Sequence, residues 1–361
     1  MSDRILVGTK KGLFDLRRTS AGWSVGAVHF LGDPVSAVLR DPQSGTLYAA
    51  LALGHFGNKL WASQDDGKSW TERVAPAFPP KPEGTEDPHP WTVHSVGMLE
   101  PGGVPGRIWA GTVGGGLFRS DDHGESWTLN QPLWDQPERQ KWMGGGNDQA
   151  SVHSICVHPA NADDLAVGVS VGGVWRSRDA GASWSLIGDG LVADYMPPEL
   201  QGAKEAQDPH RVVQARSNPD RLWCQHHNGI FRSDDRGTTW TRINSAKPSA
   251  FGFGVAVHPD KPDRAWFVPA VKDEKRYPVD GKLVVTRTDD AGKTFAVLVN
   301  GLPQQPAYDL VYRHALDIDG SGERLAFGST TGGVWVSENG GERWAELPAR
   351  LPPIACLRFA A

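Results

Sequence analysis

The chain has 361 residues, which fits one large domain or two ordinary ones, and its formal net charge of −5 gives no basic field for nucleic acid or an anionic membrane surface. Its 43 glycines, 27 prolines and 15 tryptophans are typical of many short strands joined by turns. No apolar run approaches the roughly 18 to 20 residues of a membrane span, so we expect neither a nucleic-acid nor a membrane partner.

The first residues already show a strand pattern. Apolar runs at 5–11, 12–18 and 22–28 are separated by turn residues and predict three consecutive strands. No charged segment, apolar core or cleavage site typical of a secretory signal precedes them. We therefore expect a cytoplasmic protein.

A four-strand unit then repeats along the chain. It is clearest at 153–187, where strand-length runs, termed A, B, C and D, occupy 153–159, 164–170, 173–177 and 183–187. Five more stretches fit the same unit, with strand A beginning at 35, 93, 211, 254 and 308. In the last stretch the predicted strands are 308–314, 324–329, 333–337 and 343–347.

An eight-residue motif occupies the C–D turn of each unit. Its copies begin at 63, 120, 177, 233, 288 and 337, and five of the six read Ser/Thr-x-Asp-x-Gly-x-x-Trp/Phe. The aspartate can accept hydrogen bonds from turn N–H groups, and the glycine supplies a positive φ. Phe295 replaces the usual Trp and Asn339 replaces the Asp, which predicts weaker turns in those two copies. We interpret the recurring carboxylates as structural rather than catalytic; they are Asp65, Asp122, Asp179, Asp235 and Asp290.

The two ends of the chain complement each other. The strands within 5–28 supply B, C and D of a further unit, and the run at 354–359 is a strand with no neighbour in sequence. If these pair, residues 1–361 form a single all-β domain, a seven-bladed β-propeller of four-stranded blades that is closed by its C-terminal strand. The alternative, an open β-solenoid, leaves the complementary ends unexplained.

Three D–A connections, 74–91, 130–151 and 188–210, are longer than a turn requires, and in a propeller they share one face with the B–C turn at 226–229. This arrangement predicts a pocket at one mouth of the central channel for a glycan or another small polar ligand. The candidate ligand-binding residues are Trp91, His94, Trp142, Asn147, Tyr195, His210, Arg211, Arg216, His226 and His227.

Several of these candidates are histidines. If His94, His153, His210 and His227 converge, they can hold a divalent metal ion that activates a water molecule or polarises a carbonyl group. The simpler alternative is that each histidine only makes hydrogen bonds at a strand end. The three cysteines, Cys156, Cys224 and Cys356, lie in apolar runs, and we expect them to be buried free thiols.

The eight-residue motif resembles the Asp-box, or bacterial neuraminidase, repeat of the sialidase-like β-propellers, and its copies span nearly the whole chain. The resemblance implies glycoside hydrolysis by an arginine triad, a tyrosine activated by a glutamate, and an aspartate. Sialidases are six-bladed and carry Phe/Tyr-Arg-Ile-Pro early in the chain, whereas residues 7–16 here read VGTKKGLFDL. We therefore do not expect a standard sialidase.

Three functional hypotheses follow. The first is a glycosidase-like protein that acts on or binds a glycan, with Asp148, His153, Asp194 and Glu199 as candidate catalytic residues. It is supported by resemblance to each half of the two-propeller xyloglucan-cleaving endoglucanases. The second is a non-catalytic scaffold for a protein partner, since blade number, length and box placement resemble the photosystem II stability and assembly factor family. The third is a hydrolase or lyase that depends on a histidine-bound metal.

Overall fold

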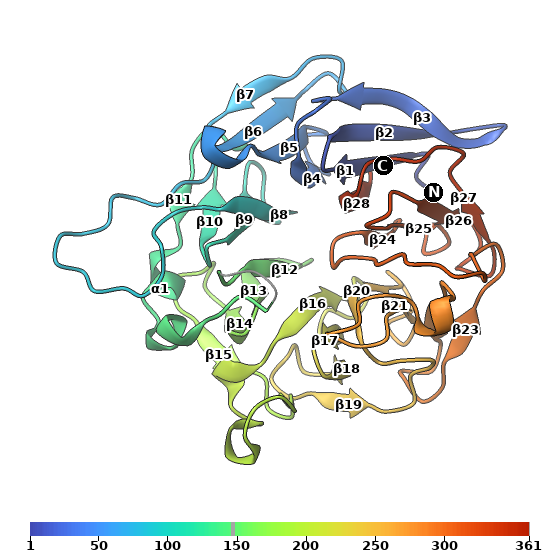
Figure 1. Cartoon of the computed structure of the whole chain (residues 1–361). Helices are drawn as coiled ribbons and strands as arrows, with labels where there is room; N and C mark the ends of the chain where they lie inside the picture. Colours follow the sequence, from blue (N-terminus) through green and yellow to red (C-terminus); the bar gives the residue numbers. More distant parts are fainter. Residues whose placement is uncertain (146–148, 361) are drawn as a thin grey trace.

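The computed structural model describes residues 1–145 and 149–360, which form seven four-stranded antiparallel sheets arranged as blades around an axis (Figure 1). This confirms the predicted seven-bladed propeller. Strand A of each blade lies nearest the axis, and strand D lies at the rim. Because every strand pairs within its own blade, the D–A connections carry the chain from one blade to the next.

The strand bounds match the predicted units in all but one blade. Blade 1 comprises β28 (Ile354–Phe359), β1 (Arg4–Thr9), β2 (Gly12–Thr19) and β3 (Gly22–His29). Blades 2 to 4 comprise β4 (Val35–Arg40), β5 (Leu47–Ala52), β6 (Asn58–Ser63) and β7 (Thr71–Arg73); β8 (Ser95–Pro101), β9 (Ile108–Val113), β10 (Leu117–Ser120) and β11 (Thr128–Leu129); and β12 (Val152–His158), β13 (Asn161–Val169), β14 (Gly173–Ser177) and β15 (Ser185–Ile187). Blades 5 to 7 comprise β16 (Pro209–Gln214), β17 (Leu222–His226), β18 (Gly229–Ser233) and β19 (Thr241–Ile243); β20 (Gly252–Val257), β21 (Ala265–Pro269), β22 (Val285–Thr288) and β23 (Ala296–Leu298); and β24 (Leu316–Ile318), β25 (Leu325–Gly328), β26 (Val334–Ser337) and β27 (Trp344–Glu346).

The C-terminal strand closes the ring as expected. Strand β28 pairs antiparallel with β1, with Gly8 opposite Cys356. A Cβ atom at Gly8 would lie 2.6 Å from the Cys356 sulfur, so a larger residue would force these strands apart. The amide of Ala360 then donates to the carbonyl of Arg4 at 3.1 Å. The first sheet is therefore built from both ends of the chain.

The Asp boxes are turns held by their own side chains. In the box at 63–70, Ser63 Oγ accepts from the amide of Gly67 at 2.8 Å, and Asp65 Oδ1 accepts from the amide of Ser69 at 2.9 Å. Hydrogen bonds from Ser69 and Ser63 lower the pKa of Asp65 to about 2. The structural role assigned to these carboxylates is confirmed, because each is engaged within its own turn.

The predicted strand A of blade 7 is wrong. It was expected at 308–314, whereas the paired strand is β24, which places Leu316 opposite Phe327 of β25. The run 308–314 is apolar like a strand because it holds Leu310 and Val311, which are buried, and Tyr308 and Tyr312, which are 70% and 41% exposed. This segment belongs to the D–A connection, and it lies on the surface around the channel.

The two faces of the ring differ in what they carry. We term the side with the D–A and B–C connections the loop face, and the side with the A–B and C–D turns the turn face. All the helical segments in the described ranges lie in loop-face connections: η1 (Gly54–Phe56), α1 (Gln131–Trp134), η2 (Pro137–Lys141), η3 (Pro198–Leu200), η4 (Lys204–Ala206) and η5 (Val279–Gly281). None of them is long and apolar enough to cross a membrane.

The core lies between neighbouring sheets. A fully buried tryptophan in strand B or C marks five blades: Trp109, Trp175, Trp223, Trp266 and Trp335. The three cysteines are buried and free, as predicted. Burial raises the pKa of Cys156 to about 11 and that of Cys356 to about 12, so both remain thiols near neutral pH.

Candidate functional site

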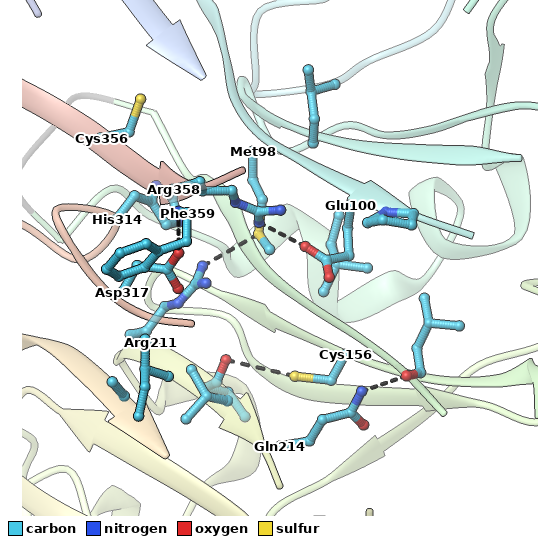
Figure 2. A pocket seen from close by; sticks show the side chains of 18 of the residues that line it. Met98, Glu100, Cys156, Arg211, Gln214, His314, Asp317, Cys356, Arg358 and Phe359 are labelled. Carbon is cyan, nitrogen blue, oxygen red and sulfur yellow. Dashed lines mark hydrogen bonds and ion pairs between the residues drawn. The ribbon is translucent and has the colours of Figure 1, made fainter. Parts of the chain in front are cut away.

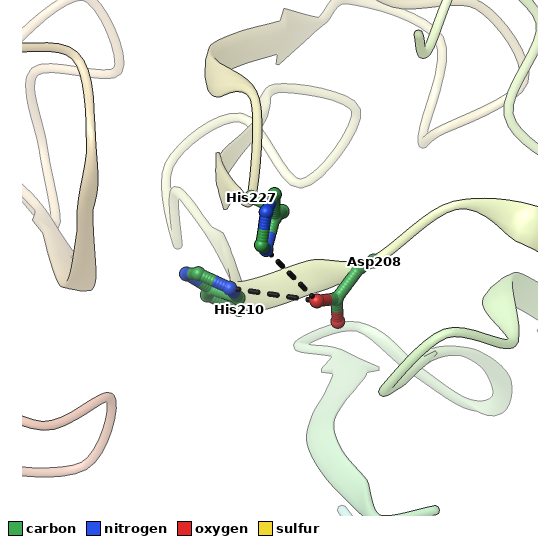
Figure 3. Close-up of side chains that lie close together, drawn as sticks. All are labelled: Asp208, His210 and His227. Carbon is green, nitrogen blue, oxygen red and sulfur yellow. Dashed lines mark ion pairs between the residues drawn. The ribbon is translucent and has the colours of Figure 1, made fainter. Parts of the chain in front are cut away.

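Three ionisable side chains meet on the loop face where strand A of blade 5 begins (Figure 3). His210 Nε2 lies 3.5 Å, and His227 Nδ1 lies 3.4 Å, from the same oxygen, Oδ2, of Asp208. The three atoms lie within 4.8 Å of one another. Asp208 and His210 are buried, whereas the His227 side chain is 19% exposed, so solvent reaches the cluster from the His227 side.

Sheet register brings Asp208 and His227 together. Pro209 of β16 is paired with His226 of β17, and Asp208 and His227 are the next residues beyond this pair. The amide of His227 donates to the carbonyl of Asp208 at 2.9 Å, which extends the ladder by one step. The two side chains are therefore held by the backbone rather than by a flexible loop.

A β-bulge places the third member of the cluster. The register shifts between Pro209 and Arg211, which leaves His210 unpaired. Bulges re-aim a side chain, and His210 at this one contacts Gly252 and Phe253 of blade 6. The same shift occurs in strand A of blade 4, where His153 is the unpaired residue. The two histidines are therefore equivalent positions of neighbouring blades.

The His210 ring is fixed on both sides. Its Nδ1 donates to the carbonyl of Gly252 at 2.7 Å, and its face stacks on Phe253 with a centroid distance of 4.5 Å and an interplanar angle of 12°. Since a carbonyl oxygen only accepts, the Nδ1 atom carries the proton. Nε2 is then the ring nitrogen that faces Asp208.

Asp208 is held from its other side. Its Oδ1 accepts from the amide of Val171 at 3.2 Å, and its own amide donates to His226 Nε2 at 3.1 Å. A Cβ atom at Gly145 would lie 2.6 Å from Oδ2, so the backbone at 145 packs directly on the carboxylate. His226 is thus buried and supports the Asp208 backbone. Because its Nε2 accepts from the Asp208 amide, this nitrogen cannot make the predicted contact with a ligand.

The charge states follow from these contacts. Burial alone would raise the pKa of Asp208, but His210 and His227 hold it well below its usual range. The neighbouring Asp208 carboxylate raises the pKa of His227. Burial lowers the pKa of His226 to about 3, so this ring is neutral at any physiological pH. The cluster therefore centres on one anionic carboxylate.

Aromatic side chains surround the cluster. Tyr195 packs edge-on against His227 with ring centroids 5.0 Å apart, and Phe251 lies 6.0 Å from the same ring. Phe253 continues this wall to Tyr312 at 6.1 Å. Rings that enclose a few polar groups are typical of ligand sites.

Exposed apolar side chains gather on the same face. Thirteen large hydrophobic residues of the described ranges are exposed, and eight of them lie in loop-face connections beyond the ends of the outer strands. The remaining five are Met1 and four valines on or next to outer strands. The eight are Leu31, Phe56, Met143, Tyr195, Leu200, Tyr277, Tyr308 and Tyr312.

Other predicted histidines and arginines lie outside the cluster. His153 is buried and its Nδ1 contacts Ser154 Oγ at 2.9 Å, while His94 is exposed on the loop face. Within the described ranges neither belongs to a metal-type group, so the predicted four-histidine metal set is wrong. Arg216 follows β16 at the turn face and contacts the carbonyl of Gly320 at 3.4 Å, so it cannot contact a ligand at the opposite mouth.

The predicted carboxylates do not form a facing pair in the described part of the chain. Asp194 is bound by Arg242 at 2.6 Å on the surface, and Glu199 is exposed in η3. Asn147 and Asp148 lie outside the described residues. An acid–base pair for glycoside hydrolysis therefore gains no support from Asp194 and Glu199.

The two predicted tryptophans are packed rather than presented to a ligand at the mouth. Trp142 is 1% exposed and lies edge-on against Trp175, so the structure contradicts a ligand role for its ring. Trp91 is half-buried, donates from Nε1 to Asp87 at 2.8 Å and packs on Trp134. It lines a surface hollow of about 750 Å³ beside β7, away from the cluster.

A separate cavity of about 520 Å³ lies on the axis, lined by the second halves of the A strands and by residues of the A–B turns (Figure 2). It therefore belongs to the turn-face half of the channel. Arg358 donates to Glu100 at 2.6 Å, and the amide of Phe359 donates to Asp317 at 2.8 Å. Burial raises the pKa of Asp317 to about 6 even though Arg358 opposes this shift.

Arg211 lines the same cavity. Its Nη1 donates to the carbonyl of His153 at 3.1 Å, and His314 Nε2 donates to that carbonyl at 2.7 Å. Burial lowers the pKa of Arg211 to about 10, and the nearby Arg358 adds to this shift. Arg211 therefore faces the axial cavity and lies outside the Asp208 cluster at the loop-face mouth, where it was predicted to bind a ligand.

Sequence reasoning missed the carboxylate at the centre of the site. Asp208 lies inside the connection singled out at 188–210 and directly precedes Pro209-His210. Its place opposite the His226-His227 pair could have been found from the hairpin register of β16 and β17. The aromatic residues Phe251, Phe253 and Tyr312 carried no such signal, because they come from other blades.

Comparison with known proteins agrees with the fold and the repeat. A family model described as BNR-Asp box repeat matches residues 230–243. The probable oligoxyloglucan-reducing end-specific xyloglucanase of Neosartorya fischeri is 22% identical over 282 residues, which cover 71% of this chain and 32% of that protein. The chain spans about a third or less of the length of the curated relatives it matches.

Two solved structures represent the neighbouring propellers. The GH74 xyloglucanase from Xanthomonas campestris superposes with a TM-score of 0.64 at 17% identity, covering 100% of this chain and 53% of that one. YCF48 bound to D1 peptide gives a TM-score of 0.51 at 14% identity, covering 86% of this chain and 81% of that one. At such identities the likeness establishes the fold alone.

Proposed function

We propose that this propeller recognises a glycan, or a small polyhydroxylated molecule, on its loop face. The observation that carries the proposal is the placement of tyrosine: four of the five tyrosines are exposed in loop-face connections of blades 5 to 7, and Tyr195 and Tyr312 contact the rings at the Asp208 cluster. The four are Tyr195, Tyr277, Tyr308 and Tyr312.

Exposed tyrosine rings suit a sugar for a physical reason. A pyranose presents C–H groups on its faces and hydroxyls at its edge, so it packs on an aromatic ring while polar groups bind its rim. Here the rings stand beside a buried carboxylate and two imidazoles. The xyloglucanase relatives support a glycan as the ligand class.

The proposal is tested by affinity electrophoresis of the full chain in gels containing xyloglucan or other soluble glucans. We expect retardation of the wild type, and about tenfold weaker binding for Tyr308→Ala and Tyr312→Ala, because truncation of an aromatic anchor costs about 1 to 2 kcal/mol. Phe56→Ala, on the same face but in blade 2, is the matched control and should bind normally. Equal mobility in gels with and without polysaccharide would refute glycan recognition.

Cleavage is tested separately from recognition. Release of reducing ends from xyloglucan oligosaccharides is measured for the wild type, Asp194→Asn and Glu199→Gln. Since Asp194 is bound to Arg242 and Glu199 is exposed, we expect neither variant to alter any activity that the wild type has. Loss of activity in either variant would restore the sequence-based catalytic assignment.

A second candidate function is docking of a protein or peptide. It is favoured by Leu31 and Phe56, which are exposed on the loop face beside blades 1 and 2, and by the peptide-bound YCF48 neighbour. Partner capture by the wild type, lost in Leu31→Ala/Phe56→Ala but kept in Tyr308→Ala, would establish docking. The reverse pattern would assign the face to the glycan.

A further inference from the structure

We propose that Asp208, His210 and His227 form a site for a divalent transition-metal ion, preferably zinc, with an open coordination position toward the loop face. This inference goes beyond glycan recognition and does not depend on it. It replaces the four-histidine set expected from the sequence, since only His210 and His227 of that set belong to the cluster.

The first argument concerns lone pairs. His210 donates its Nδ1 proton to the Gly252 carbonyl, so Nε2 is the nitrogen left for a cation, and it lies 3.5 Å from the carboxylate oxygen. At this distance the two atoms do not form a good hydrogen bond, and a cation between them would contact both. The contact of His227 Nδ1 with the same oxygen, at 3.4 Å, lacks the alignment of a hydrogen bond. A shared cation satisfies all three atoms at once.

The second argument is geometric. Ligand atoms bound to zinc at about 2.0 to 2.1 Å in a tetrahedron are separated by about 3.3 to 3.4 Å. The two contacts to Asp208 Oδ2, at 3.5 and 3.4 Å, match this edge length. Two imidazoles and one carboxylate are also a donor set that catalytic zinc sites use, with the fourth position left to water or ligand.

The third argument is the support behind the donors. Metal-binding histidines commonly donate their other ring N–H to a backbone carbonyl, as His210 does to Gly252. The carboxylate is likewise held at its remaining oxygen by the amide of Val171. The bare backbone of Gly145 then leaves room for Oδ2 to face the histidines.

The open position suits an oxygen ligand. His227 is the partly exposed donor, so a fourth ligand would enter from the loop face between Tyr195 and Phe251. Arg313 lies near enough to Asp208 for their charges to interact, and it donates to Ser170 Oγ at 3.2 Å. The single carboxylate does not neutralise the combined positive charge of a divalent ion and the Arg313 guanidinium. An anionic or strongly polar fourth ligand is therefore favoured.

The test uses the full chain purified without an affinity tag, stripped with a chelator and titrated with Co²⁺ and Zn²⁺. We expect one equivalent of metal by elemental analysis, a visible Co²⁺ spectrum of a low-coordinate site, and a zinc-dependent rise in melting temperature. Outer-shell changes alone weaken metal binding by about 10- to 100-fold, so removal of a donor in His227→Ala or Asp208→Asn should exceed about 100-fold. Zinc should no longer raise the melting temperature of either variant.

His94→Ala is the matched control, because it removes an exposed loop-face histidine outside the cluster and should leave metal binding unchanged. If Asp208→Asn fails to fold, His227→Ala decides the question, since its side chain is partly exposed. A cooperatively folded wild type that takes up no metal would overturn the proposal and leave a proton as the shared cation. Equal losses in His94→Ala and His227→Ala would overturn it as well. Loss of glycan binding alone would not.

Discussion

Aspartates occupy three kinds of position in this propeller, and their surroundings separate them. Asp65 lies in an exposed turn, where hydrogen bonds from Ser69 and Ser63 stabilise the anion. Asp208 is buried but kept ionised by two histidines. Asp317 is partly exposed to the axial cavity, and the loss of solvent around it outweighs the nearby arginines. The residue type alone therefore says little about chemistry, and the solvent and donors around each carboxylate decide its role.

Asp317 should make stability depend on pH. Its folded pKa is about 6 and its unfolded value is about 3.8, so folding favours the protonated acid. Above pH 6 the folded protein bears the full cost of a buried anion, and this cost disappears as the pH falls below 4. Asp317→Asn keeps an acceptor for the Phe359 amide and should be more stable than the wild type by about 2 kcal/mol at pH 8.

Urea unfolding at pH 8, 6 and 4 checks this expectation. Because the many turn carboxylates also titrate in acid, the informative quantity is the difference between the two proteins, which should shrink toward zero at pH 4. A difference that stays constant over this range would show that Asp317 does not carry the proton.

Gly145 offers a test of how precisely the Asp208 carboxylate is placed. A methyl group at this position would lie 2.6 Å from Oδ2, so Gly145→Ala should push the carboxylate away from the histidines. We expect metal affinity to fall by about 10- to 100-fold with little change in melting temperature, because the carboxylate can swing aside. The control is Gly202→Ala, another loop-face glycine with no atom within 4 Å of the added methyl. Equal Co²⁺ affinities for the two variants would contradict this geometry.

At the scale of elements, the Asp box is the unit that fixes each C–D hairpin. Asp122 Oδ1 accepts from the amide of Ser126 at 3.0 Å, and its Oδ2 accepts from the Ser126 hydroxyl at 2.5 Å. Asp122→Ala should lower the free energy of unfolding by about 1 to 2 kcal/mol, since it leaves a turn amide without its acceptor. Asp122→Asn should lose less, because Asn339 in the last box still accepts from the amide of Arg343 at 3.0 Å. Thermal unfolding of both variants measures the difference, and a more stable Ala variant would contradict the role.

The strands and boxes could be predicted because their signals are local. Turn residues and alternating apolar runs lie next to one another in the sequence, and the period repeats them in every blade. One feature of the box was not visible: the residue before the glycine is also left-handed, at φ 63° for Asp66 and 58° for Arg236. Residues as different as aspartate and arginine occupy this position in different boxes, so the residue type does not reveal its left-handed backbone.

The error in blade 7 has a different cause. Residues 308–314 are apolar like a strand because Leu310 and Val311 pack inward while Tyr308 and Tyr312 face solvent. The buried residues of this segment make tertiary contacts outside a sheet. The local sequence pattern is the same for such contacts and for strand pairing, so it could not distinguish the two. The site was partly predictable for a related reason. His210 and His227 share one hairpin, whereas Phe251 and Phe253 arrive from the next blade.

At the scale of the whole molecule, the propeller separates its working parts onto two faces. The Asp boxes and the axial cavity belong to the turn-face half, and the Asp208 cluster with the exposed tyrosines belongs to the loop face. Short A–B and C–D turns keep the turn face uniform, so the long D–A connections can vary without disturbing the ring. Because of this division, the Asp-box carboxylates can recur in the blades for structural reasons while the Asp208 cluster occurs in blade 5 alone among the described residues.

Ring closure is the property on which this arrangement depends, and it can be tested by moving the chain ends. Removing residues 354–361 would leave β1 with an unpaired edge and expose the apolar cluster around Leu6 and Val35. We expect the truncated chain to aggregate or to lose its cooperative thermal transition. A circular permutant that joins the two termini by a short linker and opens the chain in the 74–94 connection keeps all 28 strands and should melt close to the wild type. If the truncated chain melts as the wild type does, β28 is dispensable, and the ring is held by contacts between blades rather than by the closing strand.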